Sequence, residues 1–123
     1  MNLVKVILRP EKAIVLKDIL SGSGYHGITT KEISGYGEQK QTIKQVYRGR
    51  VYEQVVDSVK RSELEFVVPD DNVEKVMETI RSAVSTGQGG DGRIYVIPMK
   101  DAVHIHSGTK HSGDSSEEEI ADT

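Results

Sequence analysis

A glycine cluster near the end of the sequence is its best candidate for binding a ligand. It reads T-G-Q-G-G-D-G-R-I-Y-V from Thr86 to Val96. Glycine lacks a β-carbon, so it adopts positive φ angles and lets a ligand approach the main chain. Successive amides that turn the same way form a concave anion site, and Arg93 can add charge-assisted hydrogen bonds. The cluster therefore predicts an anion-binding loop. The alternative is a plain helix end that leads into a strand, since helices commonly end on glycine.

The same cluster contains the bare pattern G-x-G-x-x-G at Gly87, Gly89 and Gly92. A dinucleotide-binding fingerprint follows a strand and opens a helix. Here a predicted helix comes first and a predicted strand follows. We therefore reject the dinucleotide-binding interpretation and keep the anion-binding one.

Histidines form the second group of residues that could do chemistry. His104 and His106 have the i, i+2 spacing that places two side chains on one face of a strand, with His111 close by in sequence. Such imidazoles could bind one metal ion. No nucleophile motif accompanies them, and no H-E-x-x-H spacing occurs, so we do not expect an enzyme.

Composition limits the classes of protein. The chain has 123 residues, a net charge of −3 and no cysteine. One domain fits this length. The acidic balance argues against a general nucleic-acid binder or a binder of anionic membranes. The lack of cysteine excludes disulfides and thiolate chemistry. No apolar run approaches the roughly 20 residues of a membrane span, so we expect a soluble, cytoplasmic protein without direct membrane insertion.

Periodicity predicts the elements that must position these residues. Two helices are expected, one over Glu11–Leu20 and one with an apolar stripe from Val73 to Val84, for which Asp70, Asp71 and Asn72 supply N-cap chemistry. The predicted strands are Leu3–Leu8, Ile28–Ile33, Leu64–Val68, Ile94–Ile97 and a short fifth, Ala102–Ile105. The order β-α-β-β-α-β predicts an α+β, ferredoxin-like sandwich, with the helices on one face of an antiparallel sheet. With few aromatic residues, we expect the other face to be buried against further subunits.

Two segments stand apart from these elements. Residues 36–60 show no sustained period, carry mixed charges and include several valines and tyrosines. Loops of this length are usually functional or disordered, so we favour a mobile recognition loop over the alternative of an extended hairpin. Residues 109–123 contain S-G-D-S-S-E-E-E and little to bury, so we expect an acidic, disordered tail that follows a domain of residues 1–108.

The residues together resemble the PII signal-transduction family. The resemblance rests on Arg9, Pro10 and Lys12, on G-Y-H-G-I-T at 24–29, on G-Y-G-E-Q-K at 35–40, on Y-R-G at 47–49, and on T-x-x-x-G-D-G-R-I within the glycine cluster. It implies a homotrimer of ferredoxin-like subunits that binds ATP or ADP in clefts between subunits. It also implies a protruding T-loop, residues 36–60, that docks on a target.

The resemblance also implies roles for single residues. Thr29 would contact the adenine, Val67 would offer backbone contacts to the base, and Glu65 would face the ribose. In the family, a glutamine at the position of Gln39 helps to hold magnesium and 2-oxoglutarate. The remaining nucleotide-site residues are Gly35, Gly37 and Glu38 at the loop base, Gly87, Gly90, Asp91, Gly92 and Arg93 in the phosphate loop, and His104 and His106. Possible effector contacts are Gln39, Lys40 and Arg61, and the target-binding loop contains Tyr47, Arg48, Gly49 and Tyr52.

Departures from the family pattern change what we expect. Glu38 stands where the family usually has a basic residue, and His104 and His106 stand where it has an R-x-R pair. Arginine is always charged, whereas an ordinary histidine side chain is mostly neutral at pH 7. We interpret the two histidines as substituted phosphate contacts, not as metal ligands, and expect ADP or AMP to compete well with ATP. Altered spacing argues against nucleotidyl modification of Tyr52.

The function implied is a signal-transduction protein that senses adenine nucleotides and regulates a transporter or enzyme of nitrogen metabolism. A membrane transporter would recruit the protein to the membrane. Two alternatives stay open: a PII-like regulator of a carbon-uptake or other non-nitrogen transporter with an altered effector, and an interaction protein that senses no nucleotide.

Overall fold

A computed structural model describes residues 1–111, with the side chains of 36–43, 45, 53–58 and 111 not described. Strands and helices follow one another in the order expected of a ferredoxin-like sandwich, and two very short strands come at the end. The elements are β1 (Asn2–Leu8), α1 (Pro10–Gly22), β2 (Thr29–Tyr47), β3 (Arg50–Val68), a 3-10 turn (Asp70–Asn72), α2 (Val73–Val84), β4 (Arg93–Pro98), β5 (Ala102–Val103) and β6 (Lys110–His111).

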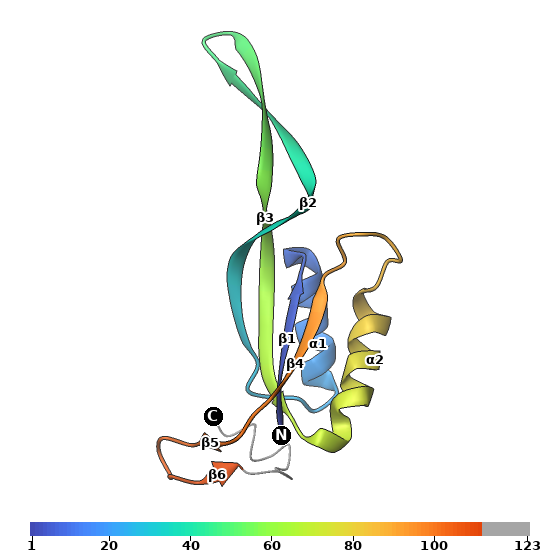
Figure 1. Ribbon diagram of the computed structural model, residues 1–123, viewed down its shortest axis with the longest axis vertical. Coiled ribbons are helices and arrows are strands. Elements are labelled where there is room, and N and C mark those ends of the chain that lie inside the picture. The colour runs from blue at the N-terminus through green and yellow to red at the C-terminus, as the bar shows by residue number, and fades with distance from the viewer. Residues whose placement is uncertain (112–123) are drawn as a thin grey trace.

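The sheet has the strand order β2-β3-β1-β4, and all of its pairings are antiparallel. Both helices lie on one side of it, and the hairpin of β2 and β3 rises far beyond them (Figure 1). This confirms the predicted α+β, ferredoxin-like sandwich. Strands β1 and β3 are central, so their alternate side chains meet the helices on one face and leave the other face open.

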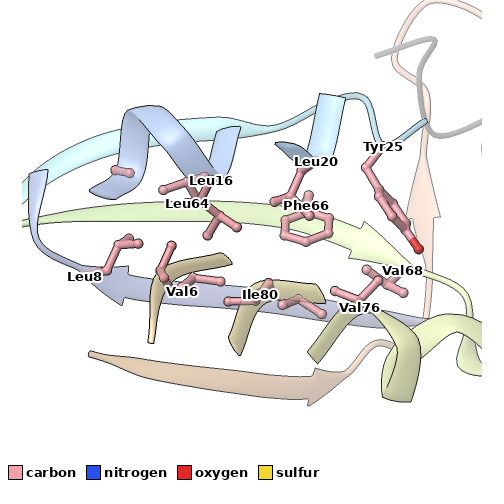
Figure 2. Close-up of a cluster of buried hydrophobic side chains, with 13 residues drawn as sticks. Val6, Leu8, Leu16, Leu20, Tyr25, Leu64, Phe66, Val68, Val76 and Ile80 are labelled. Carbon is pink, nitrogen blue, oxygen red and sulfur yellow. The ribbon is translucent and has the colours of Figure 1, made fainter. Parts of the chain in front are cut away.

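The core lies between the sheet and the helices, as Figure 2 shows. Val4, Val6 and Leu8 of β1 alternate with more exposed neighbours, which is the period-2 pattern of a strand with one buried face. Phe66 of β3 is 2% exposed and packs against Tyr25, with 5.8 Å between the ring centroids. Apolar side chains at helical spacing close the core from the other side: Ala13, Leu16 and Leu20 of α1, and Val76, Ile80 and Val84 of α2.

Helix α1 starts at Pro10, whose fixed φ suits the first helical position, and it ends at Gly22. The predicted N-cap for α2 was wrong. Asn72 makes no side-chain cap hydrogen bond, because the residues before α2 form a 3-10 turn. The Asp70 carboxylate instead accepts hydrogen bonds from the Met1 amino group at 2.7 Å and from Asn2 Nδ2 at 2.5 Å.

Over residues 36–60 the structure has the form of the alternative, an extended hairpin, while the mobility and the recognition role of this segment stay predictions. Strands β2 and β3 continue through this segment and meet at a two-residue turn, Arg48–Gly49. Both turn residues have positive φ angles, 50° and 76°, as the tight turns that match the twist of hairpin strands require. The segment is therefore an extended hairpin, which we call the hairpin arm (residues 36–59).

The pairing within the hairpin arm is irregular at one place. Tyr36 pairs with Ser58 and Gln41 pairs with Val56, so four residues of β2 face a single residue of β3 between these pairs. An excess of residues on one strand bends it and interrupts the ladder. The ribbon of β2 bends midway along the hairpin in Figure 1.

The predicted fifth strand is shorter than expected and does not join the main sheet. Strand β5 contains only Ala102 and Val103, and it pairs with β6 in a separate two-stranded sheet. Residues 112–123, which include most of the predicted acidic tail, lie outside the described residues. Neither helix within residues 1–111 has the length and apolar composition needed to span a membrane.

Candidate functional site

The glycine loop (residues 86–92) connects α2 to β4 at the end of the sheet from which the hairpin arm extends (Figure 1). Gly87, Gly90 and Gly92 have φ angles of 79°, 88° and 119°. At Gly92, a β-carbon would lie 2.0 Å from the carbonyl oxygen of Ile7, so only glycine fits against β1. Gly87 is different, because nothing lies within 4 Å of the place that its β-carbon would take.

Hydrogen bonds to an acidic side chain link the two ends of the glycine loop. The Asp91 carboxylate accepts hydrogen bonds from the Thr86 hydroxyl at 2.5 Å and from the Thr86 amide at 2.9 Å. These bonds, the Thr86 hydroxyl first, lower the pKa of Asp91, with smaller contributions from the Gly87 amide and the charge of Arg9. The Thr86 hydroxyl also accepts from the Gln88 amide at 3.3 Å. Asp91 therefore organises the loop, whereas the sequence grouped it with the phosphate-binding residues.

These internal hydrogen bonds do not use the backbone amides in the second half of the loop. Within residues 1–111, the amides of Gly89, Gly90 and Asp91 donate to no backbone or side-chain acceptor. Arg93 begins β4 directly after the loop, with an exposed side chain that makes no ion pair among the described residues. This part of the loop therefore offers hydrogen-bond donors and a positive charge, the groups that an anion needs.

Sequence reasoning missed one residue of this region. The guanidinium of Arg9 donates from Nη2 to the carbonyl oxygen of Gly89 at 3.2 Å. Arg9 was noted in the resemblance but was given no role, because 80 residues separate it from Gly89. The pairing of β1 with β4 brings the two together.

Thr29, Glu65 and Val67 lie together on the open face, where β2 meets β3. Thr29 pairs with Glu65 across the strands, and its hydroxyl donates to the Glu65 carbonyl oxygen at 3.4 Å. A hollow of about 190 Å³ opens here, and Thr29, Thr30, Lys31, Glu63 and Glu65 line it. The hollow thus brings together Thr29 and Glu65, two of the residues that the resemblance assigned to the nucleoside, and Val67 lies two residues along β3 on the same face.

Ion pairs cross the open face beside this hollow. Glu63 is only 5% exposed, and its carboxylate lies 3.0 Å from Lys31 Nζ and 3.5 Å from Lys5 Nζ. Lys5 Nζ also lies 3.7 Å from the Glu65 carboxylate. The hydrogen bond and the charge of Glu63 raise the pKa of Lys31. A buried carboxylate is costly unless it is paired, and these two lysines pair it.

Thr29 and the glycine loop lie at opposite edges of the sheet within one chain. Thr29 is on β2, while the glycine loop leads into β4, and β3 and β1 lie between them. Strands β2 and β4 are three strand spacings apart, which is about 14 Å. The row of paired residues through Thr29 meets β4 at Tyr95, two residues beyond Arg93. One chain therefore does not gather the predicted residues into one pocket.

The base of the hairpin arm has a second hollow, of about 270 Å³. Its lining residues are Pro10, Glu32, Ile33, Ser34, Lys60 and Arg61. Gly35 is adjacent, since a β-carbon there would lie 3.6 Å from Arg61 Cγ, an ordinary contact. The side chains of Glu38, Gln39 and Lys40 lie outside the described part of the chain, as does Gly37, so the structure leaves their predicted roles open.

The strand-face argument for the histidines was wrong. His104 and His106 belong to the turn that joins β5 to β6, where the His104 amide donates to the Thr109 carbonyl at 2.9 Å. The described residues contain no group of three side chains suited to hold a metal ion. The side chain of His111 is not described.

The tip of the hairpin arm gathers the residues assigned to target binding. Val46, Tyr47, Val51 and Tyr52 are between 50% and 74% exposed around the Arg48–Gly49 turn. The Arg48 guanidinium carbon lies 5.4 Å from the centroid of the Tyr47 ring, a cation–π contact. Apolar and aromatic side chains are therefore exposed at the tip of the hairpin arm.

Comparison with known proteins gives a consistent result. The family described as "Nitrogen regulatory protein P-II" matches residues 1–109. "Nitrogen regulatory protein P-II 2" of Methanothermobacter thermautotrophicus is 38% identical over 108 residues, which cover 88% of this chain and 91% of that protein. "Nitrogen regulatory protein P-II" of Azospirillum brasilense is 38% identical over 110 residues, covering 89% and 96%. The protein of that name from Rhizobium meliloti is 38% identical over 108 residues, covering 88% and 94%.

Proposed function

We propose that this chain, which belongs to the nitrogen regulatory protein P-II family, is a signal-transduction protein that binds ADP or ATP between the subunits of a homotrimer. In this proposal, bound nucleotide alters the hairpin arm, which regulates a membrane transporter or a metabolic enzyme. The observation that carries the proposal is the glycine loop. Among the described residues, its amides at Gly89, Gly90 and Asp91 have no acceptor, and the exposed Arg93 follows them directly, so the loop offers the donors and positive charge that phosphate needs.

The need for a second subunit follows from the arrangement of the site. The glycine loop and the hollow beside Thr29 lie at opposite edges of the sheet in one chain. If one copy supplies the phosphate loop and its neighbour supplies the nucleoside contacts, the two groups of residues meet at the interface between the subunits. A closed ring of identical subunits has one such interface for each subunit.

The open face of the sheet supplies a surface on which copies could pack. Leu3 of β1 pairs with Val67 of β3 and with Ile97 of β4, so these three side chains form an apolar row on this face. Tyr95 and Ile97 are 41% and 42% exposed in the single chain. Burial of apolar side chains stabilises association. We propose that the open faces of three copies cover one another.

The hairpin arm is the proposed contact with the target. It leaves the sheet on the same side as the glycine loop and exposes apolar side chains at its tip (Figure 1). Magnesium and 2-oxoglutarate would bind with ATP near Gln39 in this proposal. A regulatory role, not catalysis, agrees with the names of the relatives.

Native mass spectrometry of the full chain with ADP or ATP tests the proposal. We expect a trimer that carries up to three nucleotides. Calorimetric titration then gives the affinities, with adenosine and GTP as controls for the phosphate groups and the base. A monomer that ignores nucleotide, or a single chain that binds nucleotide without assembling, would refute the proposal.

A further inference from the structure

Two groups contact the glycine loop, one near the end of β1 and one directly after it. The Ile7 carbonyl packs so closely against Gly92 that a β-carbon would not fit there. Two residues further along the chain, the Arg9 guanidinium donates a hydrogen bond to the Gly89 carbonyl oxygen. Arg9 is held firmly at its own backbone, because its carbonyl accepts the amides of Lys12 and Ala13 that open α1. The end of β1 therefore contacts the loop at two separate points.

The contact with Gly89 determines the direction of the next amide. In a trans peptide, the carbonyl of one residue and the amide of the following residue point in opposite directions. The described chain contains no cis peptide bond. Since the Gly89 carbonyl points to the Arg9 guanidinium, the Gly90 amide points away from it. That amide is one of the three without an acceptor in the described part of the chain.

Charge gives Arg9 a second effect on the loop. The Asp91 carboxylate would repel an anion bound to the loop, and Arg9 is close enough for its charge to help lower the pKa of Asp91. The guanidinium therefore offsets part of this negative charge while it holds the carbonyl. The carbonyl contact thus sets the direction of the Gly90 amide, and the charge of Arg9 weakens the repulsion by Asp91 that an anion bound to this amide would meet.

We propose that Arg9 is a positioning residue of the glycine loop, which directs the Gly90 amide to a phosphate group of the bound nucleotide. This inference rests on the proposed function and deepens it. It separates the phosphate contacts from the nucleoside contacts at Thr29, which Arg9 does not touch. Loss of Arg9 should therefore weaken ligands that carry phosphate and spare those that do not.

Calorimetric titration of the full chain with ADP and with adenosine tests this separation. In Arg9→Ala we expect the affinity for ADP to fall about tenfold, because a misdirected amide loses much of a charge-assisted hydrogen bond. The affinity for adenosine should stay unchanged. Arg9→Lys should recover part of the loss, since an ammonium group can still donate to the Gly89 carbonyl. Lys12→Ala is the matched control, because it removes a positive charge three residues along the chain that makes no hydrogen bond or ion pair with the loop among the described residues.

A nucleotide-free measurement separates the inference from the proposed function. In amide NMR spectra of the free chain, Arg9→Ala should shift the Gly90 resonance and Lys12→Ala should not. Unchanged ADP binding in Arg9→Ala, an equal loss of adenosine and ADP, or an unmoved Gly90 resonance would each overturn the inference. A wild-type chain that binds neither ligand would refute the proposed function, and the role in phosphate binding with it.

Discussion

Replacing Gly92 by alanine should destabilise the fold much more than the same change at other glycines. The added β-carbon would lie 2.0 Å from the Ile7 carbonyl oxygen and 3.0 Å from its carbonyl carbon. Neither atom can rotate away, because β1 is paired with β3 on one side and with β4 on the other. The start of β4 would therefore have to move.

Two contributions set the size of the effect. A φ angle of 119° is strained for any residue other than glycine, which costs about 1–3 kcal/mol. Relieving the clash also breaks the end of the pairing between Ile7 and Arg93, and each lost hydrogen bond costs about 1 kcal/mol. We expect Gly92→Ala to lower the free energy of unfolding by about 3 kcal/mol.

Two other glycines provide matched controls. Gly87 has a φ angle of 79° but open space around it, so Gly87→Ala should cost about 1–2 kcal/mol from the backbone alone. Gly22 ends α1 with neither constraint, and Gly22→Ala should stabilise the chain by about 0.5 kcal/mol through reduced freedom of the unfolded chain.

Urea unfolding followed by circular dichroism measures the three changes. The protein concentration must be held constant, since the proposed assembly would stabilise the folded subunit by mass action. Midpoints are compared only among variants with the same dependence of free energy on urea. If Gly92→Ala proved as stable as Gly87→Ala, the inferred clash with the Ile7 carbonyl would be wrong.

Three further predictions concern the core and the charged groups. Phe66→Ala should lower the free energy of unfolding by about 3–5 kcal/mol, because it empties a buried ring site; a loss in urea unfolding below about 1 kcal/mol would contradict this packing. Asp91 has a lowered pKa, so the stability it adds over Asp91→Asn is present above about pH 3.8 and disappears as pH falls through its folded value. Unfolding series across acid pH check this, and a pH-independent difference would count against the bonds from Thr86. Lys31 has a raised pKa, so its advantage over Lys31→Gln is complete below about pH 10.5 and is lost above its folded value. An advantage that survived in strong alkali would argue against the pairing with Glu63.

The helices and strands of the core could be predicted from the sequence because their apolar residues recur at a regular spacing. Val4, Val6 and Leu8 alternate along β1, and Val76, Ile80 and Val84 recur at helical spacing, since each set faces one core. The hairpin arm carries no such period, and it extends beyond the helices that cover the sheet (Figure 1). Its valines and tyrosines favour strands, but the deciding feature is the turn at Arg48–Gly49.

The candidate site shows the same division. The cluster of glycines identified the loop from the sequence, since only glycine has the φ angle and the free space needed at position 92. No sequence pattern indicated that the Asp91 carboxylate would accept hydrogen bonds from Thr86 within the loop. It also placed His104 and His106 in a strand, whereas the final segment forms a separate small sheet with both histidines in its turn.

By itself, the sequence determined the fold class, the helix and strand order, the glycine loop and the likeness to a regulatory family, because local periodicity and residue type carry that information. Tertiary structure alone decided which distant residues meet. The contact of Arg9 with Gly89 and the pairing of Glu63 with Lys31 depend on the order and register of the strands. Strand order is set by the packing of the whole chain, so no local pattern encodes such contacts.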